Sequence, residues 1–367
     1  MTPHFAPRAK RVIHLFMNGG PFGPDFLDPK PALKEFEGQR PAGTDLRTER
    51  PTGGLLDAPF KYARHGQSGL EVSELLPHTA KIAHKISVIR SMETKDPNHS
   101  TGVPRVQRGD PLDRGVDYPY LGSAIAKLVG PANPQLPPYI WIKPGNGGFI
   151  HREAGFLGSK YGALALGDGK PPVHIHRPDS ISAEIDEARN VLRHKINERF
   201  KAYRHASEID AYETSYDLAR QLMARKDIFD DNLLDPKDRA RYGSHPLGRH
   251  MLQARQLLEA GVRFVKVNSY HWDTHGDNFN MSQRLVPQID QPFAALVNDL
   301  DDRGMLEDTL VIVMSEFGRT PIINSRLGRD HWPDCWSIAL AGCGIKRGAI
   351  IGETTEDGAF VNVEGYD

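Results

Sequence analysis

Short apolar runs alternate with helical segments along this chain, and this alternation constrains its fold more than any other feature. Residues 12–17, 86–92, 262–267 and 309–314 read VIHLFM, ISVIRSM, VRFVKV and TLVIVM, and turn residues or polar clusters follow each run. Runs of this length and composition are typical of strands buried on both faces. The sequence therefore predicts an α/β fold, a mostly parallel sheet with helices packed on both of its faces.

The other elements are less regular. Further strands are expected at 137–145 and 337–342, and helices at 72–86, 118–130, 182–204, 245–261 and 287–304. In the second helix we expect Leu121, Ile125 and Leu128 to form the apolar face. Charged residues are distributed along the predicted helix at 182–204, which predicts that this helix is exposed to solvent. Three prolines in 22–36 predict an irregular loop, and the glycine-rich stretch 150–173 predicts a loop over one face of the sheet.

Length and composition favour one globular unit. The chain has 367 residues without an internal repeat or a linker-like tract, so we expect a single domain over 1–367 with insertions at about 150–240. The chain has 46 Lys and Arg residues and 47 Asp and Glu residues. This balanced charge gives no indication of nucleic-acid binding, which usually requires an excess of basic residues. No run approaches the roughly 18–20 apolar residues of a membrane span. Cys335 and Cys343 are too few for a disulfide framework and are interpreted as thiols. Oligomeric state stays open.

Polar segments follow the predicted strands and should converge. In open α/β sheets, ligands bind outside the carboxyl ends of the strands. The segments that leave this edge are NGG after Met17, SMETKDPNHSTG from Ser91, NSYHWDTHGDN from Asn268 and SEFGRTP from Ser315. Residues far apart in the sequence can therefore meet at one rim.

The segment HWDTHGDN is the most metal-like. His271, Asp273 and His275 alternate, so an extended stretch points all three side chains the same way. Imidazole and carboxylate are zinc ligands, and carboxylate also suits harder cations. The alternative is an Asx-turn loop in which the aspartate caps backbone amides.

A second cluster lies in SEFGRTP and GRDHWP. Glu316 directly follows a buried strand, where a carboxylate is unfavourable unless it is paired or bound to a cation. Asp330 and His331 are adjacent in a short, stiff loop. These groups indicate further metal ligands. The alternative is ordinary ion pairing, of Glu316 with Arg319 and of Asp330 with Arg329.

The segment TKDPNHSTG offers hydroxyl and amide groups. A hydroxyl near a metal ion can act as a nucleophile, and an amide such as that of Asn98 can donate to a developing oxyanion. The alternative is a plain polar turn. No P-loop, nucleophile elbow or dinucleotide fingerprint is present.

These motifs together resemble the domain-of-unknown-function family 1501, related to the alkaline phosphatase and sulfatase superfamily. SEFGRTP followed by GRDHWP is the most specific part, and LEAGVRFVKVNSYHWDTHGDN and VIRSMETKDPNHS extend the resemblance over nearly the whole chain. It implies an alkaline-phosphatase-like core with one or two divalent ions, zinc first, with calcium, magnesium or manganese as alternatives. Asp273, His275 and His331 would hold the first ion. Glu316 and Asp330 would serve the second, with Thr94 as nucleophile and Asn98 aiding the oxyanion.

Two departures from the family pattern bear on this expectation. The superfamily places an Asp after the first strand, where this chain has Asn18, which argues against a second ion and two-metal hydrolysis. Asp25 and Asp28 are the nearest carboxylates that could replace it. Family members also continue past the last residues of this chain and often begin with a twin-arginine export signal. We therefore expect an incomplete C-terminus. The sequence contains no recognisable export signal and on this basis predicts a cytoplasmic location, whereas the resemblance implies export to the periplasm.

The leading hypothesis is a metal-dependent hydrolase of phosphate or sulfate esters. A small-molecule or carbohydrate ester would be attacked by Thr94 or by water, with Arg319 or Asn98 steadying the charged oxygens. A different class is an inactive sulfatase-like scaffold that binds a carbohydrate or a protein partner, which the missing strand-one Asp favours. A third is a metal-free α/β binding protein.

Overall fold

The central element is an eight-stranded sheet in the order β14-β5-β13-β9-β1-β8-β6-β7. The structure, a computed structural model, describes residues 6–40, 46, 48–109, 115–144, 153–170, 175–202, 207–230 and 234–362. The strands are β1 Arg11–Met17, β5 Ile86–Met92, β6 Tyr139–Lys143, β7 Leu164–Gly167, β8 Phe264–Ser269, β9 Thr309–Met314, β13 Trp336–Ala341 and β14 Ile350–Ile351. Among these described strands β13 alone runs antiparallel to its neighbours. The predicted α/β fold with a mostly parallel sheet is confirmed.

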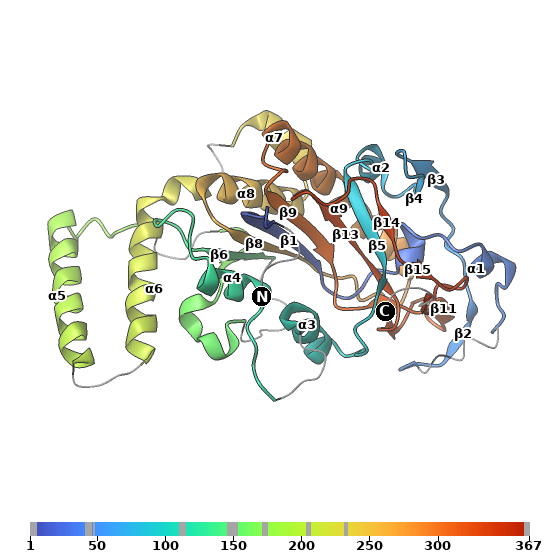
Figure 1. The fold of residues 1–367 in the computed structure, drawn as a ribbon, viewed down its shortest axis with the longest axis horizontal. Helices are drawn as coiled ribbons and strands as arrows, with labels where there is room; N and C mark the ends of the chain where they lie inside the picture. The colour runs from blue at the N-terminus through green and yellow to red at the C-terminus, as the bar shows by residue number, and fades with distance from the viewer. Residues whose placement is uncertain are drawn as a thin grey trace.

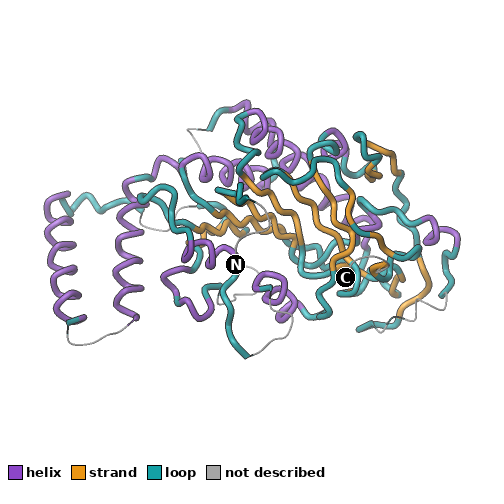
Figure 2. The backbone as a smooth tube through the Cα atoms, in the orientation of Figure 1, coloured by secondary structure: helices purple, strands orange, loops and turns teal. Residues whose placement is uncertain are grey.

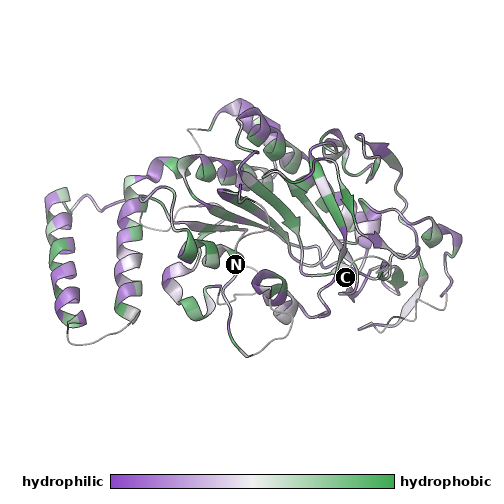
Figure 3. Ribbon diagram, viewed as in Figure 1, coloured by the Kyte–Doolittle hydropathy of each residue, from purple (hydrophilic) through white to green (hydrophobic). Residues whose placement is uncertain are grey.

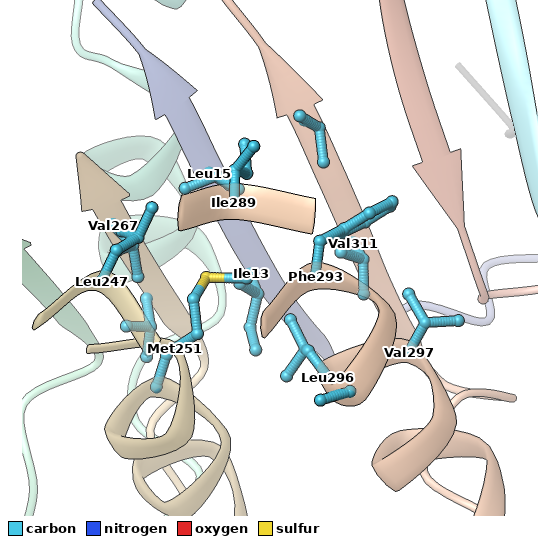
Figure 4. Close-up of a cluster of buried hydrophobic side chains, with 14 of the residues drawn as sticks. Ile13, Leu15, Leu247, Met251, Val267, Ile289, Phe293, Leu296, Val297 and Val311 are labelled. Carbon is cyan, nitrogen blue, oxygen red and sulfur yellow. The ribbon is translucent and has the colours of Figure 1, made fainter. Parts of the chain in front are cut away.

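Helices cover both faces of the sheet (Figure 1). One face carries α2 Pro77–Lys81, α7 Pro236–Tyr242, α8 Pro246–Ala260 and α9 Asn278–Asp302. Along the other face lie α3 His99–Arg108 and α4 Leu121–Leu128. Figure 4 shows how Met251 of α8 and Phe293 of α9 pack against Ile13 of β1 and Val311 of β9. Each such buried apolar side chain stabilises the fold by about 1.5–3 kcal/mol.

Smaller elements surround the sheet (Figure 2). One is the short helix α1 Pro31–Glu35. The two-stranded pairs are β2 Thr52–Leu55 with β11 Ile322–Asn324, β3 Tyr62–His65 with β4 Leu70–Ser73, β10 Gly318–Arg319 with β12 His331–Trp332, and β15 Glu353–Thr354 with β16 Val361–Asn362. The described residues also contain four 3-10 turns, at Gly23–Asp25, Gly155–Leu157, Ser159–Tyr161 and Lys226–Phe229. Two long helices, α5 Ala183–Lys201 and α6 Ser207–Ala224, extend to one side of the sheet. None of the described helices is long and apolar enough to cross a membrane.

Several local predictions need correction. Within 22–36, predicted as irregular, Pro31 opens helix α1, because proline fits the first helical position, where no N–H bond is lost. Helix α4 buries Gly122, Ser123 and Ala126, whereas Leu121 and Leu128 are 46% and 82% exposed. The expected apolar face is therefore wrong: small residues allow the helix to approach Tyr139 closely, as the clash of a Cβ at Gly122 with that ring at 2.6 Å shows.

The region 150–240 was predicted only coarsely. Of the expected loop 150–173, residues 150–152 and 171–173 lie outside the described residues, and 153–170 contain two 3-10 turns and the edge strand β7. The helix predicted at 182–204 corresponds to α5, and residues 203 and 204 of the predicted range lie outside the described part of the chain. Residues 72–76 and 82–85, expected as helix, flank the short α2.

Candidate metal centre

Four strand-to-loop transitions meet at one edge of the sheet. β1 is parallel to both β8 and β9, with Met17 level with Ser269 and Phe16 level with Met314, so their loops leave the sheet together. The loop after β1 contacts the loop after β9, because the Gly19 amide donates to Glu316 Oε1 at 2.9 Å. The loop after β5 joins them through the Thr94 hydroxyl, which donates to the carbonyl oxygen of Glu316 at 2.6 Å. The predicted convergence is present.

Three imidazoles surround the carboxylate of Asp273. The Nε2 atoms of His275 and His331 each lie 3.0 Å from Asp273 Oδ1, and His99 Nε2 lies 3.4 Å from Oδ2. The two Nε2 atoms of His275 and His331 are also 3.0 Å apart. The side chains of His99 and Phe317 pack against His331, with ring centroids 4.4 and 4.6 Å away, which fixes the plane of that imidazole.

An acceptor behind each ring fixes which nitrogen carries the proton. Nδ1 of His275 lies 2.7 Å from Asp330 Oδ1, Nδ1 of His331 lies 2.7 Å from the Pro97 carbonyl oxygen, and Nδ1 of His99 lies 2.6 Å from Glu316 Oε1. Carboxylates and carbonyls only accept, so the Nδ1 atoms of His99 and His331 are donors, whereas Nδ1 of His275 lies between Asp330 and the guanidinium of Arg50, which can only donate. The Nε2 atoms of the three rings then face one another and Asp273. Such an arrangement is repulsive unless a cation lies among these atoms.

The protonation preferences agree with this reading. Burial raises the pKa of Asp273, but hydrogen bonds from His275, His331 and His99 and the charge of Arg319 bring it well below its ordinary range. Burial lowers the pKa of His99, yet hydrogen bonds with Asp273 and Glu316 raise it to about 9. Burial lowers the pKa of His331. The cluster thus favours a positive charge beside Asp273, carried by a proton or by a metal ion.

The two carboxylates expected to hold a second ion lie behind the histidines. Glu316 is fully buried; its Oε1 accepts from Gly19 and His99, and its Oε2 accepts from the Ser315 hydroxyl at 2.7 Å. Asp330 is also fully buried, and its Oδ1 accepts from His275 and from Asn324 Nδ2 at 3.1 Å. Its Oδ2 is buried without a hydrogen-bond partner among the described residues. Glu316 therefore orients His99, and Asp330 orients His275.

The arginines do not form the ion pairs considered as alternatives. Arg319 contacts Asp273 Oδ1 at 2.6 Å instead of Glu316, and Arg329 lies 3.3 Å from Asp25 instead of pairing with Asp330. Arg319 is fully buried, and its other donors reach the backbone oxygens of Gly19, Gly20 and Arg329. This geometry positions Asp273 and leaves Arg319 without access to a substrate.

Arg50 is the cation at the mouth of the site. Its Nη1 donates to Asp330 Oδ1 at 3.0 Å and contacts His275 Nδ1 at 2.5 Å, a contact in which the guanidinium can only donate. The side chain is 36% exposed. Among the described residues, no hydrogen bond engages its Nε or Nη2, and that edge of the guanidinium is open to a negatively charged ligand.

The expected nucleophile and oxyanion donor have other contacts. Thr94 is buried, and its hydroxyl proton is directed to the Glu316 carbonyl. Asn98 is the N-cap of α3, where its Oδ1 accepts from the Ser100 amide at 2.9 Å. This cap starts the helix at His99 and so presents that imidazole to the cluster.

Three other candidate residues lie away from the cluster. His271 has a φ of 75°, is exposed, and has no described hydrogen bond with the other histidines or with Asp273, because the backbone does not continue as an extended strand there. Asp25 binds Arg329 and Asn278, and Asp28 binds Lys30 and Arg90. Neither replaces the missing acid at Asn18, whose Oδ1 instead accepts from Asn268 Nδ2 at 2.5 Å.

Two glycines allow the loops to approach. A Cβ on Gly19, which has a φ of +119°, would lie 2.2 Å from the Asp273 amide nitrogen. A Cβ on Gly328 would lie 2.0 Å from the carbonyl carbon of His275. Both positions bring the backbone of one site loop against the backbone of the HWDTHGDN loop, which a larger residue would prevent.

Sequence reasoning missed part of the cluster. In the sequence, His99 is one of several polar residues of TKDPNHSTG, and its position after a strand end is the signal that could have identified it. Glu49, whose Oε1 is 3.4 Å from His331 Nδ1, and Arg50 lie far from any recognised motif, and nothing in the sequence marks them. Within this cluster, two triads have ligand atoms within 4.8 Å of one another: His99, Asp273 and His331, and Glu49, His275 and His331.

Fold and site together define an α/β protein with a histidine-rich cluster at the carboxyl edge of its sheet. The chain belongs to the family described as Protein of unknown function (DUF1501), whose sequence model matches residues 9–365. No curated protein matches the chain.

Solved structures with similar folds are distant in sequence. Ps i-CgsB in complex with k-i-k-neocarrahexaose is 9% identical, with 96% of this chain and 73% of that chain covered and a TM-score of 0.41. A member of the alkaline phosphatase superfamily from Vibrio parahaemolyticus is 10% identical, with 96% and 65% covered and a TM-score of 0.39. A mutant of the alkaline phosphatase of the Antarctic bacterium TAB5, with Mg bound, is 11% identical, with 96% of each chain covered and a TM-score of 0.40.

Proposed function

We propose that this protein is a hydrolase of phosphate or sulfate esters that depends on one divalent ion held by the histidine cluster. The observation that carries the proposal is the convergence of the His275 and His331 Nε2 atoms and Asp273 Oδ1, each 3.0 Å from the others. His99, on the other side of Asp273, completes a set of three imidazoles and one carboxylate. Metal-bound histidines usually hydrogen-bond a carboxylate or carbonyl oxygen through their other ring nitrogen, and such acceptors lie behind these rings.

The donor set favours zinc. Calcium and magnesium prefer oxygen ligands, whereas three nitrogens and one carboxylate oxygen suit zinc or another transition metal. Glu316 is engaged by three donors, which leaves it poorly placed to hold a second ion. Once bound, the ion would supply Lewis acidity toward an ester oxygen and an attacking water.

The chain itself supplies the remaining functions. Asp273 is 43% exposed, so the cluster opens to solvent and a substrate can reach it. Arg50 offers free guanidinium donors beside it, which fit the charged oxygens of a phosphate or sulfate group. Because the Thr94 hydroxyl donates to a backbone carbonyl, we propose water as the attacking group. The substrate class is a small-molecule or carbohydrate ester.

Turnover of aryl phosphate and aryl sulfate esters by zinc-loaded protein tests this function. We expect hydrolysis of one ester class by the wild type and loss of more than about 100-fold in Asp273→Asn. Arg50→Ala should raise KM more than it lowers kcat, because it removes a substrate contact, while the exposed Arg64→Ala serves as a matched control. Hydrolysis that persists in Asp273→Asn would contradict the proposal.

A second candidate is an inactive scaffold that binds a carbohydrate or a protein partner. Asn18 in place of the expected acid and the engaged hydroxyl of Thr94 both favour it. A stoichiometric ion without turnover of either ester would support the scaffold, whereas turnover would rule it out.

A further inference from the structure

Helix α5 turns its polar side toward the rest of the protein. Its half-buried positions are Asp186, Asn190, Arg193, Asn197 and Lys201, which recur every three or four residues and are all polar. The contacts across to α6 are likewise polar, since Arg193 pairs with Asp217 at 3.1 Å and Lys201 pairs with Glu213. This face is therefore the one that packs on α6.

The apolar side of α5 points into solvent. We call Ile185, Ala188, Leu192 and Ile196 the α5 stripe; Ile185 is 52% exposed, and Leu192 and Ile196 are each 58% exposed. At 100° per residue the stripe lies about 100–180° around the helix from the centre of the half-buried polar positions. No residue of α5 is buried. Val191, beside the stripe, is 45% exposed, and with Ala188 and Leu192 it lines a shallow groove along the helix.

This pattern is the reverse of an ordinary amphipathic surface helix. Such a helix buries its apolar stripe and exposes its charges, and a contiguous exposed stripe of large apolar side chains marks an interaction surface. In Figure 1, α5 stands at the far end of the molecule, away from the sheet, and Figure 3 shows green apolar segments along it. The stripe is thus accessible to a partner without rearrangement of the body.

We propose that the α5 stripe binds the α5 stripe of a second copy of this chain, with the two helices antiparallel about a two-fold axis near Leu192. Such an interface is isologous, since the same surface is used on both copies.

Charge supports a second copy in this orientation. The first turn of α5 carries Glu184 and Asp186, and its last turn carries Arg199 and Lys201. Glu184 and Arg199 lie about four turns apart, which places them on the same flank of the stripe. The midpoint between them falls between Val191 and Leu192, half a residue from Leu192. In an antiparallel pair, Glu184 of each copy therefore lies level with Arg199 of the other, and the two helix dipoles oppose each other favourably.

Side-chain size agrees with the same register. The midpoint of Ala188 and Ile196 is Leu192, so the small alanine of one copy faces the larger isoleucine of the other. Leu192 then packs against its own counterpart on the axis. One axis position thus satisfies both the charged flank and the apolar stripe.

The mass of the full-length protein in solution, measured by analytical ultracentrifugation across micromolar concentrations, tests the proposal. We expect a monomer–dimer equilibrium for the wild type and a monomer for Leu192→Glu at every concentration. Leu128→Glu on α4, at a position 82% exposed, introduces the same charge off the stripe and should leave the dimer intact. Circular dichroism verifies that α5 stays helical in each variant.

A charge swap tests the orientation. Glu184→Arg and Arg199→Glu should each weaken dimerisation about tenfold, because each places like charges together twice. The double variant should restore wild-type affinity. A wild type that is monomeric throughout, a dimer that survives Leu192→Glu, or a double variant weaker than both single variants would each overturn the proposal.

Discussion

For single residues, metal binding depends on which nitrogen of each histidine faces the cluster. His99, His275 and His331 each have Nδ1 held by an oxygen acceptor, so their Nε2 atoms are available to a shared cation. The contacts favour other roles than those expected from the sequence: Glu316 and Asp330 contact the rings from behind, and Arg319 contacts Asp273. Asp273, which faces the cluster, and Glu316 and Asp330, which lie behind the rings, are all carboxylates in recognisable motifs. Only the geometry of the folded chain therefore distinguishes a metal ligand from a group that supports one.

His99 should be as important for metal binding as the histidines of the recognised motifs. We expect His99→Ala to lower zinc affinity by more than about 100-fold, since it removes a ligand and not only a supporting contact. His271→Ala should leave the affinity unchanged, because His271 is exposed and has no described hydrogen bond with the cluster. Competition with a chromogenic chelator measures both, and equal losses in the two variants would refute the assignment.

Glu316→Gln separates an orienting role from a ligand role. The amide keeps the size of the side chain and one accepting oxygen, so we expect a loss of about 10–100-fold in zinc affinity, typical of groups behind a ligand. A complete loss of the ion at saturating zinc, with unchanged melting behaviour, would show instead that Glu316 coordinates it directly.

At the element scale, the loops after the strands were the most predictable part of the site. The buried strands β1, β5, β8 and β9 follow from their apolar runs, and parallel pairing then brings their carboxyl ends together. The place of β13 follows from its apolar run, but its antiparallel direction does not, because a short apolar run carries no signal for direction. The edge strand β7 and helix α6 were not predicted.

The loop after β1 gives a test at this scale. Gly19→Ala should destabilise the fold by about 1–3 kcal/mol or more and reduce zinc affinity, since the left-handed backbone is strained and the new Cβ meets the Asp273 amide at 2.2 Å. Gly38→Ala is the matched control: its φ is +77°, but a Cβ there has nothing within 4 Å. Urea unfolding compares them, and equal losses would argue against close packing of the Asp273 loop.

At the scale of the whole molecule, buried neutral histidine makes the fold sensitive to acid. His14 lies in the centre of the sheet beside Phe16 and Phe264, and burial, helped by the charge of Lys266, lowers its pKa to about 3. The unfolded chain binds this proton near its ordinary pKa of about 6.5. The unfolding free energy is therefore unaffected above that pH and falls as the pH drops from about 6.5 toward 3.

Replacing His14 should remove this contribution. We expect the unfolding free energy of His14→Leu to decline less steeply than that of the wild type, by about 1.4 kcal/mol per pH unit between about pH 6 and pH 4. Urea titrations at several pH values measure the slopes. Parallel slopes for the two proteins would show that His14 is protonated in the folded state.

The metal content of protein purified without chelators tests the central claim most directly. Elemental analysis should find one divalent ion per chain in the wild type and in the control Asp277→Ala, which removes an exposed carboxylate of the same loop. It should find none in Asp273→Ala. A wild type without stoichiometric metal after incubation with zinc, or an Asp273→Ala variant that keeps its ion, would contradict the account.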